Sequence, residues 1–180
     1  MKQKVPVLPR LVIVIAALIA IAAFFLPYIS ATDSYREYME TRADEKVYES
    51  ASLTVRGMED MSLFEYASVY AQAGKEIFRS ADAGTFYAVL IGAIGVSALL
   101  ILLAGAKGKP ILTIFLDLVM GGAFWAINWD VTDRGIMPNS NHVWGIAYQL
   151  YYPLAVIIAI SAIWLFVAKR KAKKAQRIAA

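Results

Sequence analysis

The chain has 180 residues, of which 59% are hydrophobic and 18% are charged, and its mean hydropathy is +0.56. This composition is too apolar and too weakly charged for a soluble domain, and the absence of cysteine excludes disulfides and thiolate chemistry. The apolar residues fall into four blocks separated by polar stretches. This pattern predicts an all-α integral membrane protein, a bundle of four transmembrane helices with a mainly helical extracytoplasmic cap between helices 1 and 2.

A cytoplasmic tail over residues 1–10 precedes the first expected span, residues 11–30. Twenty residues make about 30 Å of helix, which is enough to cross the hydrocarbon core. The basic residues before this block would also suit a signal peptide. The length of the apolar run and the lack of a clean small-x-small cleavage site favour an uncleaved anchor.

Residues 31–84 form the expected cap, which contains an amphipathic helix over residues 62–79. Ser62 and Glu65 fit the S-x-x-E capping box at its start. The apolar face of this helix could pack on its own domain or on the spans, lie among lipid headgroups, or bind a partner. We predict that it is the interaction face of the cap, made of Leu63, Tyr66, Tyr70, Ile77 and Phe78.

The rest of the chain continues the alternation of apolar and polar segments. In order, we expect a second span at 85–105, a cytoplasmic turn at 106–110, a third span at 111–128, an extracytoplasmic loop at 129–144, a fourth span at 145–168 and a basic cytoplasmic tail at 169–180. Small residues let helices approach closely in lipid. The small residues expected at the helix contacts are Gly84, Ala88, Gly92, Gly121 and Gly122.

Basic residues set the orientation. Lys2 and Lys4 lie in the first tail, Lys107 and Lys109 lie in the turn, and the tail over 169–180 is strongly basic, whereas the cap is acidic. The positive-inside rule therefore places both termini in the cytoplasm. The same charges account for the pI of about 9.2 without a nucleic-acid partner. The basic tail serves either as a topological signal or as a site for anionic lipid.

Asp117 is the one charged residue inside the third span. A carboxylate at this depth is costly and normally faces protein or water. We expect an intramembrane polar layer that joins Asp117 to Ser97 and Ser161, which lie at similar depth, and to Thr113, which lies one turn below Asp117 on the same helix. Three roles remain open: structural hydrogen bonding, contact with a partner subunit, and an ion or proton site on a transport path.

No catalytic, cofactor or metal site is predicted. The single histidine, His142, could form a triad with Asp130 or Asp133, but no nucleophile motif accompanies it. The expected function is a non-enzymatic accessory or interaction subunit of a larger membrane or cell-surface assembly. The alternative is a small oligomeric transporter or channel component with Asp117 on the path.

The expected partners are the lipid bilayer and either another membrane or extracytoplasmic protein or further copies of this chain. The lack of cysteine and of N-x-[ST] sequons favours a bacterial plasma membrane as the location.

Overall fold

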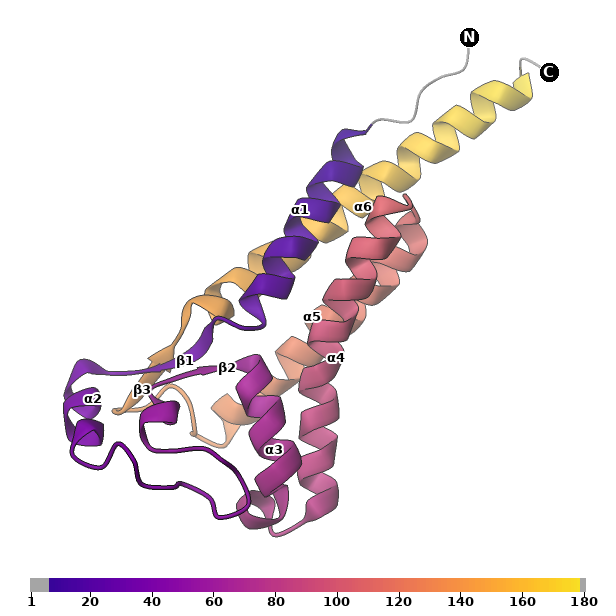
Figure 1. Cartoon of the computed structure of the whole chain (residues 1–180). Helices are drawn as coiled ribbons and strands as arrows, with labels where there is room; N and C mark the ends of the chain where they lie inside the picture. Colours follow the sequence, from indigo (N-terminus) through magenta and orange to yellow (C-terminus); the bar gives the residue numbers. More distant parts are fainter. Residues whose placement is uncertain (1–6, 179–180) are drawn as a thin grey trace.

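Four long helices form the body of the molecule in the computed structural model, which describes residues 7–178 (Figure 1). Each of the four packs on two others, so that α1 and α5 both contact α4 and α6. The start of α1 and the end of α6 lie at one end of this bundle, and the shorter elements gather at the other. Lys2 and Lys4 lie outside the described residues. The four helices are α1 (Leu8–Ala23), α4 (Ala81–Ala106), α5 (Pro110–Asp133) and α6 (Ile146–Ile178).

Three of these helices, α4, α5 and α6, are long and apolar enough to cross a membrane. Helix α1 is apolar but has only 16 residues. The prediction of one helix over residues 11–30 is wrong, because α1 stops at Ala23 and strand β1 (Pro27–Ala31) follows. Pro27 explains the stop, since proline lacks an N–H and disfavours helical geometry in the residue before it.

A three-stranded antiparallel sheet closes the end of the bundle that is far from the start of α1. Strand β1 lies between β2 (Asp60–Ser62) and β3 (His142–Trp144). The fold is mostly helical, as the sequence predicts, and this short sheet is the part that the all-α prediction did not include. Residues 129–144 are not a simple loop either, because α5 continues to Asp133 and β3 follows. The basic segment over residues 169–178 is likewise helical, as the end of α6.

The segment between β1 and β2 holds α2 (Asp33–Glu40) and a single 3₁₀ turn, η1 (Arg56–Met58). Helix α2 is separate from α1, and Arg36 fastens it to β2 through an ion pair with Asp60, with a nitrogen–oxygen distance of 2.8 Å. The β-like run at 52–55 forms only one isolated bridge, from Thr54 to Lys46.

Helix α3 (Leu63–Phe78) begins with the capping box that its sequence predicts. The Ser62 N–H donates to Glu65 Oε2 at 2.8 Å, and the Glu65 N–H donates to Ser62 Oγ at 3.2 Å. These bonds satisfy N–H groups that the first helical turn leaves free. The helix then lies along the first half of α4 (Figure 1).

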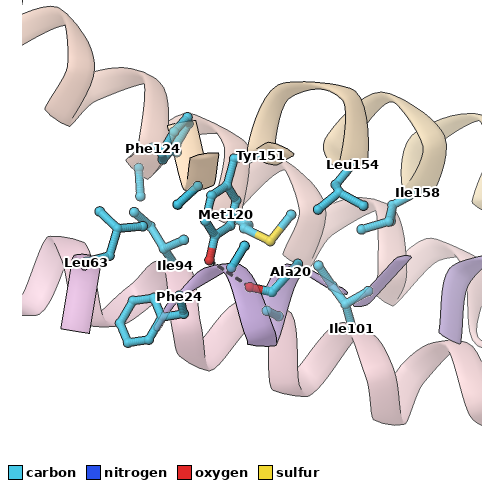
Figure 2. Close-up of a cluster of buried hydrophobic side chains, with 14 of the residues drawn as sticks. Ala20, Phe24, Leu63, Ile94, Ile101, Met120, Phe124, Tyr151, Leu154 and Ile158 are labelled. Atoms are coloured by element: carbon cyan, nitrogen blue, oxygen red, sulfur yellow. Dashed lines mark hydrogen bonds between the residues drawn. The ribbon is translucent and has the colours of Figure 1, made fainter. Parts of the chain in front are cut away.

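The core joins all the long elements (Figure 2). Side chains from α1, α3, α4, α5 and α6 meet there. Tyr151 is 2% exposed, and its hydroxyl donates to the Ala20 carbonyl at 2.9 Å. This bond links α6 to α1 inside the apolar core, where a free hydroxyl would be costly.

The α4–α5 turn accepts one hydrogen bond from α1 and one from α6. The Arg10 guanidinium of α1 donates to the Ala106 carbonyl, and the Lys169 ammonium of α6 donates to the Gly108 carbonyl. Gly108 has φ of +61°, a conformation that favours glycine. The start of α1 and the basic part of α6 are thus fixed beside the same turn.

The contact of α3 with α4 requires two glycines. A Cβ on Gly74 or on Gly84 would overlap the Cα of the other. We expect Gly84→Ala to lower the free energy of unfolding by about 1–3 kcal/mol, because neither backbone has room to move away. Thermal unfolding in detergent measures the change. Gly92→Ala is the control, because nothing lies within 4 Å of its Cβ position, and an equal loss in this control would contradict the explanation.

Candidate functional site

Asp117 lies on the buried face of α5 and is 6% exposed. The buried residues of this helix recur every three or four positions, among them Thr113 and Met120. The carboxyl group therefore faces the interior of the bundle rather than the lipid side. In a helix apolar enough to cross a membrane, such a group is costly unless protein or water solvates it.

Ser97 of α4 and Ser161 of α6 are buried as well, with exposures of 4% and 6%. The bonds of Arg10 and Lys169 to the α4–α5 turn give the helices a common register. Counted from that turn, Asp117 and the two serines lie about 10–14 Å along their helices, at 1.5 Å per residue. These three residues of the expected polar layer are thus buried and lie at nearly the same distance along the bundle axis.

The hydrogen bonds expected within this layer do not form. Asp117 Oδ1 is buried without a hydrogen-bond partner, so neither Ser97 nor Ser161 donates to it. The Thr113 hydroxyl is occupied within its own helix, where it donates to the Lys109 carbonyl at 3.0 Å. The prediction of a hydrogen-bonded layer is therefore wrong for this oxygen, because the serines reach the core without reaching the carboxyl group.

Asn128 shows how the same face of α5 satisfies another buried polar group. Its side-chain oxygen accepts a bond of 2.7 Å from the Tyr28 hydroxyl, and its amide donates to the Phe124 carbonyl at 2.6 Å. The fold gives partners to Asn128 but not to Asp117 Oδ1. A buried polar atom without a partner destabilises the folded state, so packing does not account for Asp117.

The predicted packing glycines separate into two groups. Gly84 approaches Gly74 closely, and Gly121 lies near Ala155 of α6. The prediction is wrong for Gly92 and Gly122, because a Cβ on either would meet no atom within 4 Å. Glycines that the pattern did not single out take their place at the helix contacts, namely Gly95 against Phe24 and Gly105 against Ile13.

The predicted interaction face of the cap points inward. Leu63 is fully buried, and the aromatic members pack on β1 and α4: the ring centroids of Tyr66 and Tyr28 are 5.9 Å apart, and Phe78 stacks on Tyr87 at 4.9 Å. The chain covers this face itself, and packing on its own domain and on the spans is one of the roles that the sequence leaves open. Tyr70 and Ile77, the other members, are half-buried.

Burial among these aromatic side chains raises the pKa of Tyr70 to about 12, so its hydroxyl stays neutral at ordinary pH.

An apolar groove of about 700 Å³ lies where α1, α3 and α4 meet. It forms because α1 ends at Ala23 and α3 begins at Leu63, so that each covers only part of α4. Sequence reasoning missed it, since the groove is made by the ends of separate helices. The two phenylalanines just before Pro27 were the available signal. We call this the lateral groove, lined mainly by Phe24, Phe25, Phe64, Ala88, Val89 and Gly92.

The possible triad around His142 is not assembled. Asp130 is engaged elsewhere, because it accepts a 2.9 Å bond from the Tyr87 hydroxyl and pairs with Arg134. His142 packs edge-on against Tyr35, at 5.1 Å between ring centroids. Its burial lowers its pKa, which keeps the imidazole neutral. Within residues 7–178 no three His, Asp or Glu side chains are grouped to hold a metal ion.

Comparisons of the chain with protein-family models, with curated proteins and with solved structures found no match.

Removal of the unpartnered carboxyl should stabilise the protein. We expect Asp117→Leu, which nearly keeps the side-chain shape, to raise the free energy of unfolding by about 1–3 kcal/mol, because it removes a polar atom that the core does not satisfy. The matched control is Asn128→Leu, which leaves the Tyr28 hydroxyl without its acceptor and should be destabilising by a similar amount. Thermal unfolding in detergent compares the two, and a lower midpoint for Asp117→Leu would contradict the interpretation.

Proposed function

We propose that this chain is a non-enzymatic, four-span membrane protein that serves as an accessory or interaction subunit of a larger membrane assembly. The lateral groove is the observation that carries the proposal. It is a sizeable apolar site that the chain leaves open, whereas the aromatic face of α3 is covered. We propose that the partner is another membrane protein, which places an apolar helix in this groove.

The topology that we propose has four spans, with α1 as a short first one. The apolar run from Leu11 to Leu26 continues past the end of α1, and a short span is accommodated by local thinning of the bilayer. Arg10 and Lys169 support a cytoplasmic position for both termini, because they bind the same turn and cations gather on the inner side. Residues 31–84 then form an extracytoplasmic cap, and the location is a bacterial plasma membrane.

The dimensions of the lateral groove suit one face of a helix. Its residues on α4 run from Thr85 to Leu99, a length of about 21 Å at 1.5 Å per residue, or about four turns. Phe25 and Phe64 are 60% and 51% exposed at its edge, and aromatic side chains are favoured at interfaces. Gly92 on its floor lets a second backbone approach closely.

The cap would transmit the effect of binding. Phe64 belongs both to the groove and to the first turn of α3, and the Phe64 N–H donates to the Phe24 carbonyl at 3.2 Å. Helix α3 in turn follows β2 directly. A partner in the groove therefore touches the point where the cap joins the bundle.

A photocrosslinker at Val89 tests this proposal, because Val89 is 66% exposed and lines the groove. In native membranes we expect one protein adduct of defined mass. Gly92→Leu fills the groove and should reduce that adduct by about tenfold. Gly122→Leu should leave it unchanged, because Gly122 has equally open surroundings but lies outside the groove.

An adduct of twice the mass of this chain would assign the groove to a second copy of it. Labelling of lipid alone, or equal loss in both glycine variants, would overturn the accessory role.

The unpartnered Asp117 carboxyl favours a second candidate function, a transporter or channel component. A buried ionisable residue in a membrane helix is a common sign of an ion or proton path. We expect Asp117→Asn to abolish pH-gradient-driven proton flux in reconstituted vesicles if this function is correct. Asn128→Asp adds a second buried carboxyl and serves as the control. Flux that survives Asp117→Asn unchanged would exclude a transport role for this residue.

A further inference from the structure

A second groove, of about 740 Å³, lies at the end of the bundle that holds the α4–α5 turn. It runs between the first turn of α5 and the part of α6 around residue 170. Its walls are apolar and its rim is basic, a combination that the lateral groove does not have. We call it the basic groove, lined by Lys109, Ile111, Leu112, Phe115, Phe166, Lys169, Arg170 and Lys173, with Gly108 and Pro110.

Among the described residues 7–178, no acidic side chain pairs with the cations at this groove. The sequence contains no Asp or Glu from residue 83 to residue 116 or after residue 133. All the ion pairs found among residues 7–178 involve Arg36, Arg42 or Arg134, which lie elsewhere. Lys169 is occupied by its bond to the Gly108 carbonyl. Lys109, Arg170 and Lys173 are therefore available to an anion from outside the chain.

The basic groove also has an apolar wall beside its cations. Ile111 and Phe115 are 68% and 60% exposed on the outer face of α5. They belong to a helix that is apolar enough to cross a membrane. Their exposed side chains therefore face the hydrocarbon core of the bilayer. Phe166 of α6 lies opposite, and the Arg170 guanidinium carbon sits 5.3 Å from its ring centroid. This contact holds one cation at the border between the apolar wall and the rim.

We propose that the basic groove binds one anionic phospholipid. The phosphate lies between Lys109, Arg170 and Lys173, and an acyl chain follows the apolar wall along Phe115. Charge complementarity selects the anionic headgroup, since each cation near a membrane surface contributes about 1 kcal/mol toward an anionic lipid. The positive end of α5 begins at the same place without a side-chain cap and adds to the attraction. This inference does not depend on the partner proposed for the lateral groove.

Native mass spectrometry of the whole purified protein tests the site, with dioleoylphosphatidylglycerol as the anionic probe and dioleoylphosphatidylcholine as the zwitterionic one. We expect one tightly held phosphatidylglycerol, retained about tenfold better than phosphatidylcholine. The double variant Lys109→Gln/Lys173→Gln should weaken its retention by about tenfold or more, as expected for two lost charges. Phe115→Ala should also weaken it, because the acyl chain loses its wall.

The matched control is Lys107→Gln/Lys171→Gln. It removes the same charge from the same turn and the same part of α6, but neither residue lines the groove. We expect a change of less than about twofold. Circular dichroism should show unchanged helix content in both double variants, because the substituted lysines are exposed.

Three outcomes would overturn the proposal. Equal losses in the two double variants would mean that the basic end attracts anionic lipid diffusely, without a site. Equal retention of the two lipids would mean that only the acyl chain is recognised. Displacement of phosphatidylglycerol by inorganic phosphate at constant ionic strength would mean that the groove binds free phosphate and not lipid.

Discussion

The end of the molecule that holds the sheet depends on strand β1, because both edges of this strand are hydrogen-bonded. Strands β2 and β3 pair on its two sides, and the Gly145 N–H donates to the Tyr28 carbonyl at 2.8 Å. A Cβ at position 145 would overlap the Pro27 carbonyl, so only glycine permits this approach. Since α3 follows β2 and α6 follows β3, the sheet determines where both helices begin.

Local patterns in the sequence predict the parts of the fold that local interactions determine. The apolar blocks predict helices α4, α5 and α6, and the S-x-x-E spacing predicts the cap of α3. The sheet was missed because Ile29 pairs with Met61 and with Trp144, partners far away in the chain. Strands of three to five residues carry too little alternation to be recognised without such partners.

The candidate site also has a part that the sequence predicts and a part that it does not. Asp117 stands out in the sequence because it is a carboxylate in an apolar helix, and its burial follows from the periodicity of α5. The atoms that approach Asp117 depend on how the other three long helices are rotated and shifted along their axes. The sequence does not predict this placement. The same holds for the glycines: the pattern singles out Gly92 and passes over Gly105, yet of the two only Gly105 meets a neighbour, Ile13. Both grooves arise where helices of unequal length end, so no motif marks them.

The bond from Tyr151 to Ala20 also has a consequence for biogenesis. It connects residues 131 positions apart and belongs to the core shared by α1 and α6 (Figure 2). Ribosomes add about 5–20 residues per second, so about 7–26 s separate the synthesis of its two ends. During this interval the alanine-rich face of α1 is without its final neighbour. The arrival of the last helix is therefore the step that completes the bundle, and a nascent chain that stalls before it leaves this face of α1 uncovered.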